Sequence, residues 1–157
     1  MTGTHRGFRF VLESPLLQAG WNLEAAKREV ATARRELQEA RQQLDALRQQ
    51  RGSLLTQCAA VPGGLVDLRL RDLLLRSLAD IEDRLLDAGR VVDERHADWT
   101  AAVSRCARRQ QRVEGLNDVR DRQRAAFELE QGRADARRTD DDWLMRRQGV
   151  ASPEGAI

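Results

Sequence analysis

The sequence predicts an all-α fold: a long antiparallel two-helix coiled-coil hairpin whose second helix is the longer one. Two runs of apolar residues recur every seven positions, a pattern typical of helices that supercoil against a partner. Pro62, Gly63 and Gly64 separate the two runs, so the chain supplies its own partner. Charged residues make up 33% of the chain and aromatic residues only 4%, which favours an elongated apolar seam over a compact core.

The N-terminal part is expected to form an irregular segment followed by the first helix. Residues 1–13 lack a heptad pattern, and Phe8, Phe10 and Leu12 alternate with other residues as in a short extended stretch. Ser14 is a good N-cap with Pro15 after it, so the first helix should run from about 14 to 60. Its a positions are Leu16, Leu23, Val30, Leu37, Leu44, Arg51 and Cys58, and its d positions are Ala19, Ala26, Ala33, Ala40, Leu47 and Leu54.

The two edges of this first seam differ in charge. The g edge carries Glu29 and Glu36, which we expect to pair with arginines of the second helix. The e edge is basic. Among the e positions of the second helix, which face it in an antiparallel pair, Glu82 is the one acidic residue. The basic e residues are therefore either solvated or face an acidic partner surface. The basic e residues are Lys27, Arg34, Arg41 and Arg48.

A turn at residues 61–64 should lead into a second helix from about 65 to 148. Counting back from that turn places residue 16 opposite about residue 110, so the second helix continues without an intramolecular partner. The tail, residues 149–157, is expected to be disordered. The second seam reads Leu74, Leu78, Ile81, Leu85, Ala88, Val92, Arg95, Trp99, Ala102, Cys106, Arg109, Val113, Leu116, Arg120, Gln123, Phe127, Glu130 and Ala134.

Apolar residues near the turn exceed what a two-helix seam buries. They flank Leu74 on several sides of the helix, and they are Val66, Leu68, Leu70, Leu73 and Leu75. An apolar surface of this kind is typical of a site for a partner protein. Self-association or local packing around the turn would also cover it.

The three tryptophans have different expected roles. Trp99 lies on the seam opposite small alanines and should belong to the core. Trp21 faces away from the seam. Trp143 precedes Arg146 and Arg147, and a tryptophan beside arginines is a frequent interface anchor; a merely exposed ring is the alternative.

No pattern points to catalysis, a cofactor or a metal. His5 and His96 are isolated, no Cys/His cluster has the spacing of metal ligands, and Gly63 and Gly64 lack the rest of a phosphate loop. The acidic run 140–142 is expected to be a solvated helix face. Cys58 and Cys106 are interpreted as small seam residues, too far apart along the hairpin for a disulfide.

Charge and hydropathy restrict the expected partners and location. The net charge is only +2, with 27 basic and 25 acidic residues interleaved, which is weak support for a nucleic-acid binder. There is no secretory signal and no stretch of ~20 apolar residues, so we expect a cytoplasmic protein without direct membrane insertion.

The pattern resembles the central stalk proteins of type III secretion systems, flagellar FliJ and injectisome counterparts such as YscO. The resemblance covers most of the chain: its size, the shorter first helix, the turn near residue 62 and the Arg- and Gln-rich second helix. It extends to the ending, from Glu128 through the acidic run 140–142 and Trp143 to Arg146 and Arg147. The chain lacks the exposed aromatic residues that some relatives carry near the turn.

The resemblance implies a non-enzymatic stalk, peripheral to a flagellar or virulence-associated secretion apparatus at the inner membrane. Its terminal end, with Leu16 to Leu23, would enter the hexameric secretion ATPase and promote its assembly and activity. The turn end would meet the cytoplasmic domain of the export gate, and export chaperones are further partners. The residues implied are Leu55, Val66, Leu68, Leu73 and Leu75 at the turn end, and Phe127, Trp143, Arg146 and Arg147 at the ATPase end.

Two other functions fit the same pattern. The first is a generic coiled-coil scaffold or export chaperone that acts by dimerising. The second is an Arg-rich nucleic-acid binder, whose affinity would fall steeply with salt.

Overall fold

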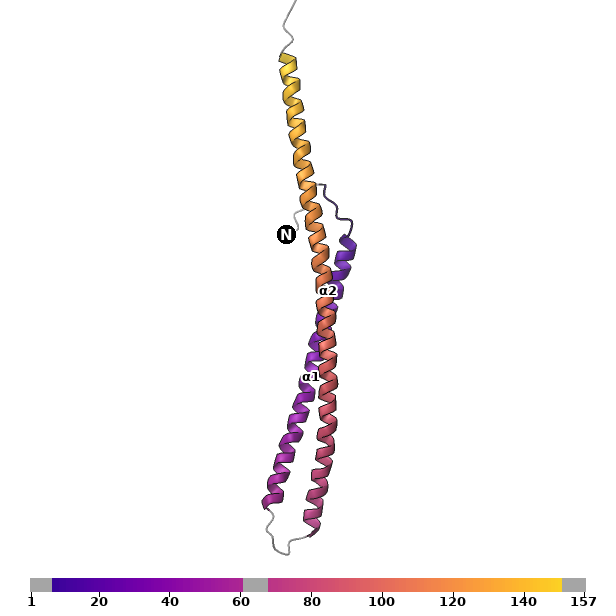
Figure 1. Ribbon diagram of the computed structural model, residues 1–157, viewed down its shortest axis with the longest axis vertical. Coiled ribbons are helices and arrows are strands. Elements are labelled where there is room, and N and C mark those ends of the chain that lie inside the picture. The colour runs from indigo at the N-terminus through magenta and orange to yellow at the C-terminus, as the bar shows by residue number, and fades with distance from the viewer. Residues whose placement is uncertain (1–6, 61–67, 151–157) are drawn as a thin grey trace, which may run out of the picture. The chain divides into compact units, whose positions relative to one another are not determined.

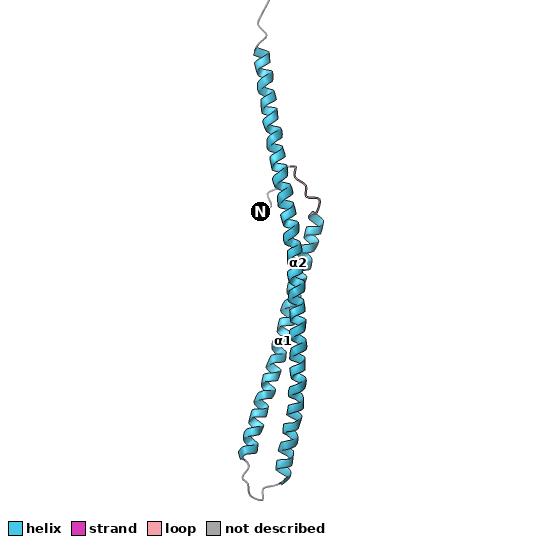
Figure 2. Cartoon of the chain, viewed as in Figure 1, coloured by secondary structure: helices cyan, strands magenta, loops and turns pink. Residues whose placement is uncertain are grey.

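The computed structural model describes residues 7–60 and 68–150. Within these ranges the chain forms two helices and no strand (Figure 2). Helix α1 runs over Glu13–Ala60 and has 48 residues, and helix α2 runs over Leu68–Val150 and has 83. The predicted all-α hairpin with a longer second helix is confirmed.

Helix α1 begins slightly before the expected cap. The N–H of Leu16 donates to the carbonyl of Leu12 at 3.0 Å, and the N–H of Glu13 donates to the carbonyl of Phe10 at 3.4 Å. Leu12 therefore takes the N-cap position expected for Ser14. Pro15 still lies in the first turn, where backbone N–H groups have no intrahelical acceptor. Proline, which has no N–H, therefore loses no helical hydrogen bond there.

The expected boundaries near the turn and at the tail fall partly outside the described residues. The predicted turn at 61–64 and the helix start near 65 lie outside the described residues, and α2 is described from Leu68. At the other end α2 continues to Val150, two residues past the expected boundary. Residues 151–157 of the expected tail also lie outside the described part.

The chain divides into two compact units. One comprises Trp21–Gln110, and the other combines Met1–Gly20 with Gln111–Ile157. Both helices contribute to each unit, because each helix passes from one unit into the other.

The 21–110 unit is an antiparallel helix pair held by the predicted seam. In this unit α1 lies alongside α2 (Figure 1). All of its described buried residues are seam residues, and most are small or medium in size. They are Leu23, Ala26, Leu37 and Ala40 on α1, and Ile81 and Ala102 on α2. Because alanines alternate with leucines, the helices pack through a thin apolar layer rather than a thick core.

Contacts between the helices define a register that differs from the expected one. Arg109 Nη1 donates to the carbonyl oxygen of Asn22 at 2.9 Å, whereas the sequence placed residue 16 opposite about residue 110. The difference is about one and a half helical turns. Part of it follows from the connection, because the second helix was expected to begin near 65 and is described from Leu68.

The second unit is organised around an aromatic contact with the N-terminal segment. The rings of Phe8 and Phe127 lie 5.6 Å apart at 51°, and Phe10 is only 4% exposed. Gly7 adopts a φ of 106°, a conformation that L side chains rarely adopt, and a Cβ there would lie 3.5 Å from Phe127 Cζ. The segment before α1 therefore packs on α2 instead of forming an extended stretch.

Candidate interaction surfaces

The described residues offer surfaces rather than an enclosed chemical site. Across residues 7–60 and 68–147, no buried polar side chain is present. The same residues contain no group of three His, Cys, Asp or Glu that could hold a metal ion. In the part of the chain that the structure describes, no helix is long and apolar enough to span a membrane.

An exposed apolar surface lies beside the turn, on both helices. We call Leu55, Leu68, Leu70, Leu73 and Leu75 the turn-end cluster, and these side chains are 44%, 84%, 41%, 60% and 54% exposed. Leu74, on the seam, is half-buried. Because a helix turns one stripe toward its partner, leucines on both sides of Leu74 stay in water. Val66, predicted for the same surface, lies outside the described residues.

A second exposed surface lies near the end of α2. We call Trp143, Leu144, Met145, Arg146 and Arg147 the C-terminal patch. Trp143 is 58% exposed and Met145 76% exposed, and the guanidinium of Arg147 lies 5.2 Å from the centre of the Trp143 ring. This spacing of one helical turn forms a cation–π contact worth ~0.5–1 kcal/mol at an exposed site. The pair presents a flat, positively charged face.

Phe127 does not lie with that patch, although the resemblance grouped it there. Its ring is half-buried and packs against Phe8. The heptad pattern carried no signal for this contact, because it relates residues within helices and says nothing about the segment before them. An alternation of aromatic residues ahead of a helix start was the one available hint.

Trp99 is less enclosed than predicted. The ring is half-buried rather than a core residue, and it lies 5.8 Å from the His96 ring at 49°. It lines a hollow together with Arg34, Leu37, Gln38 and Arg41. Trp21 is 72% exposed, in agreement with its predicted outward position.

The two cysteines are free and half-buried. Cys58 and Cys106 both occupy seam positions. They were interpreted as small buried apolar residues, and the structure leaves each of them partly accessible.

The g edge of the 21–110 unit is neutralised by ion pairs, as the sequence predicted. Glu29 pairs with Arg105 at 3.6 Å, and Glu36 pairs with Arg95 at 3.2 Å. Arg95 was assigned to the seam, but it is exposed and also contacts Asp98 at 3.5 Å. An arginine leaves an apolar seam readily, because its long stem lets the guanidinium reach water and carboxylates.

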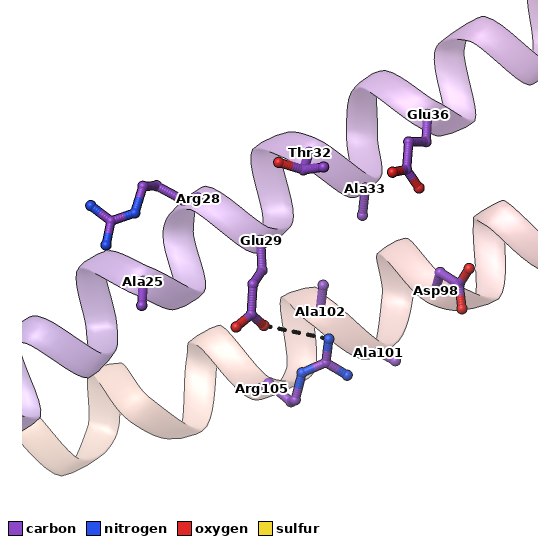
Figure 3. A pocket seen from close by; sticks show the side chains of 10 residues that line it. All are labelled: Ala25, Arg28, Glu29, Thr32, Ala33, Glu36, Asp98, Ala101, Ala102 and Arg105. Atoms are coloured by element: carbon purple, nitrogen blue, oxygen red, sulfur yellow. Dashed lines mark ion pairs between the residues drawn. The ribbon is translucent and has the colours of Figure 1, made fainter.

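A shallow groove follows this paired edge. Its volume is about 560 Å³, and Figure 3 shows the Glu29–Arg105 pair reaching between the helices. Ala25, Ala33, Ala101 and Ala102 are among its lining residues. The groove exists because alanines from both helices leave the edge thin.

The e edge is different, because the ion pairs of its basic residues lie within α1 and do not reach the other helix. Lys27 pairs with Glu24 at 2.7 Å and Arg48 with Asp45 at 3.1 Å, both within α1. The hydrogen bond from Lys27 lowers the pKa of Glu24, and the same contact raises the pKa of Lys27. Across the helices, Glu82 does pair on this side, at 3.5 Å, but with the seam residue Arg51.

Comparison with known proteins gives one family match. The family model described as "Flagellar FliJ protein" matches residues 12–149, which covers α1 and nearly all of α2. No curated protein and no solved structure matches the chain significantly.

Proposed function

Because the chain belongs to the flagellar FliJ protein family, we propose that it is the coiled-coil stalk of a type III secretion system, linking the hexameric export ATPase to the export gate. Proteins of this family are structural components of protein export rather than enzymes. In the proposed role the chain is cytoplasmic and peripheral to the apparatus at the inner membrane. It promotes assembly and activity of the ATPase, with export chaperones as further partners.

The family match across both helices carries the proposal, and the two exposed surfaces support it. The turn-end cluster is assigned to the cytoplasmic domain of the export gate, with Leu55, Val66, Leu68, Leu73 and Leu75 as the contact residues. Exposed leucines suit a protein partner, since burying each contributes roughly 1.5–3 kcal/mol before the entropic costs of association.

The C-terminal patch is assigned to the ATPase, with Trp143, Arg146 and Arg147 as the contact residues. Tryptophan and arginine are the residue types that dominate binding energy at protein interfaces. Phe127 contributes to this end indirectly, because its ring already packs against Phe8. Leu16 to Leu23 of α1 belong to the same proposed end.

The experiment is to add the purified protein to the cognate type III secretion ATPase and measure ATP hydrolysis and hexamer formation. We expect both to rise. Replacing Trp143 by Ala together with Arg146→Gln and Arg147→Gln should abolish the increase, while Arg137→Gln with Arg138→Gln removes equal charge nearby and should preserve it. No stimulation by the intact protein would count against the stalk function.

The turn-end assignment needs a different readout. Leu73→Ser with Leu75→Ser should leave ATPase stimulation unchanged but weaken binding to the isolated cytoplasmic domain of the export gate. Leu86→Ser is the matched control, because Leu86 is 64% exposed and lies outside the turn-end cluster. Equal weakening by both changes would remove the assignment.

The alternative is a generic scaffold or chaperone that acts by dimerising, and the exposed turn-end cluster is the observation that favours it. The two functions predict different masses for the protein in solution. The stalk is expected to be monomeric at low micromolar concentration by light scattering, whereas an obligate dimer, with the mass halved by Leu73→Ser and Leu75→Ser, would establish the alternative.

A further inference from the structure

The two edges of the 21–110 unit are unequal in charge, and the difference lies in two arginines. On the g edge, Glu29 and Glu36 neutralise Arg105 and Arg95. On the e edge, no carboxylate among the described residues lies within ion-pair distance of Arg34 or Arg41. The corresponding e positions of α2 are Gly89, His96 and Val103, and none of them is acidic.

The unpaired arginines border a hollow with an apolar floor. Arg34, Leu37, Gln38, Arg41 and Trp99 line it, and its volume is about 520 Å³; we call these residues the basic-edge hollow. Leu37 is 5% exposed and Trp99 is half-buried, so part of the apolar floor is open to solvent. Gly89 adds no side chain on this edge, and a Cβ built there would meet nothing within 4 Å.

The spacing of the arginines indicates the shape of a complementary ligand. Arg34 and Arg41 are seven residues apart on one helix, or about 10 Å along its axis. A second helix with carboxylates seven residues apart presents them at the same interval. Guanidinium groups bind carboxylates through two parallel hydrogen bonds, and an apolar residue between the carboxylates would cover Leu37 and Trp99.

We propose that the basic-edge hollow docks an acidic amphipathic helix of another protein, whose glutamates pair with Arg34 and Arg41 while its apolar face covers Trp99. The hollow shares no residue with the turn-end cluster or the C-terminal patch, so the inference does not depend on either assigned contact. The complex extends the two-helix seam locally into three helices, with the partner supplying the charge that the hairpin lacks on this edge.

The charge pattern favours an acidic helix over nucleic acid. A phosphate backbone is bound by a continuous basic stripe, but Lys27 and Arg48, on either side of the two arginines, are already paired with Glu24 and Asp45. Among the described bases at the e positions of α1, Arg34 and Arg41 have no carboxylate partner, and both adjoin an apolar floor that a phosphate cannot use.

The test uses two synthetic amphipathic peptides of three heptads each, with leucine at a and d. One carries glutamate at e and g and the other lysine. Binding is followed by anisotropy of labelled peptide, and by Trp99 emission in a Trp21→Phe, Trp143→Phe background that leaves Trp99 as the remaining tryptophan. We expect the acidic peptide to bind and to shift Trp99 emission to the blue, and the lysine peptide to do neither.

Matched variants locate the binding. Arg34→Gln with Arg41→Gln should weaken binding of the acidic peptide by at least about tenfold. Arg28→Gln with Arg35→Gln removes the same charge at the same spacing from the outward face of α1, and binding should change by less than about twofold. Circular dichroism checks that both variants retain the wild-type helical content.

Several results would overturn the proposal. They are no binding of the acidic peptide up to about 100 µM, equal binding of both peptides, equal loss in the two double variants, or unchanged Trp99 emission. A labelled single-stranded RNA that binds more tightly than the acidic peptide, and loses affinity with Arg34→Gln and Arg41→Gln, would assign the hollow to nucleic acid instead.

Discussion

Single residues of the seam set how closely the helices approach. Ala26 is fully buried and Ala102 is 2% exposed, so these positions have no room for a larger side chain. At such sites small residues are required by volume rather than by helix propensity. The alanines therefore act as spacers between the larger buried leucines, Leu23 and Leu37.

Enlarging one of these spacers should destabilise the hairpin. Ala26→Leu is expected to lower the free energy of unfolding by ~1–3 kcal/mol, because extra methyl groups force the helices apart. Ala31→Leu is the control, since Ala31 is exposed on the same helix, and its effect should stay within about 0.5 kcal/mol. Urea unfolding followed by circular dichroism measures both, and similar values would contradict the tight packing at Ala26.

The Glu24–Lys27 contact should be visible in the titration of Glu24. Because Lys27 lowers the pKa of Glu24, the contact adds stability above the ordinary carboxyl pKa, and this stability is lost as the pH falls through the lowered value. NMR titration should find the Glu24 pKa below its ordinary value, and Lys27→Gln should bring it back. An unchanged pKa in Lys27→Gln would show that another group lowers it.

At the scale of elements, the segment before α1 packs on α2, and we call residues 7–12 the N-terminal clasp. The Phe8 ring contacts Phe127, and a Cβ at Gly7 would lie 3.5 Å from Phe127 Cζ. Phe10, two residues after Phe8, is buried. This contact joins the start of α1 to a part of α2 where the seam has become polar, with Gln123 and Glu130 exposed. The clasp replaces seam packing where the heptad pattern weakens.

Removing the two phenylalanine rings of the N-terminal segment should loosen α2 locally. Phe8→Ala with Phe10→Ala is expected to speed amide hydrogen exchange around Phe127 by about tenfold or more, because burying two aromatic rings is worth several kcal/mol. Val11→Ala is the control, since Val11 is 85% exposed. Exchange around Phe127 that the double change leaves untouched would rule out a stabilising clasp.

At the scale of the whole molecule, stability should be distributed unevenly along the chain. The 21–110 unit has a buried seam and interhelical ion pairs. In contrast, all side chains described from 135 to 147 are exposed. An isolated helical segment of this length is marginal in water, because helices in proteins owe most of their stability to packing.

The prediction is a steep gradient in hydrogen exchange. Amides of residues 135–147 should exchange at least about a hundredfold faster than those around the seam residues Leu37 and Ile81, which are buried. Mass spectrometry of peptic fragments measures the difference. Comparable protection in both regions would mean that an unrecognised contact, such as self-association, covers the end of α2, and a dilution series identifies that case.

The sequence by itself determined the fold class, the two helices and the seam that joins them. Heptad periodicity is a local property, so seam positions such as Leu37 and Ala102 follow from counting along one helix. The same count identified the exposed leucines at 68, 70, 73 and 75 and the pairing of Glu29 and Glu36 with arginines, whereas Leu55 came from the family resemblance. Of the C-terminal patch, the family resemblance implied Trp143, Arg146 and Arg147. The structure adds the exposed Leu144 and Met145 and the contact of Arg147 with Trp143.

Only the tertiary structure decided the register, the clasp and the state of the basic edge. Register depends on where two helices end and begin, and a small error in the connection moves every opposing residue, as the Asn22–Arg109 contact shows. No periodicity relates Phe8 to Phe127, because their contact joins an irregular segment to a distant helix. Whether Arg34 and Arg41 find a carboxylate likewise depends on which residues the register brings opposite them.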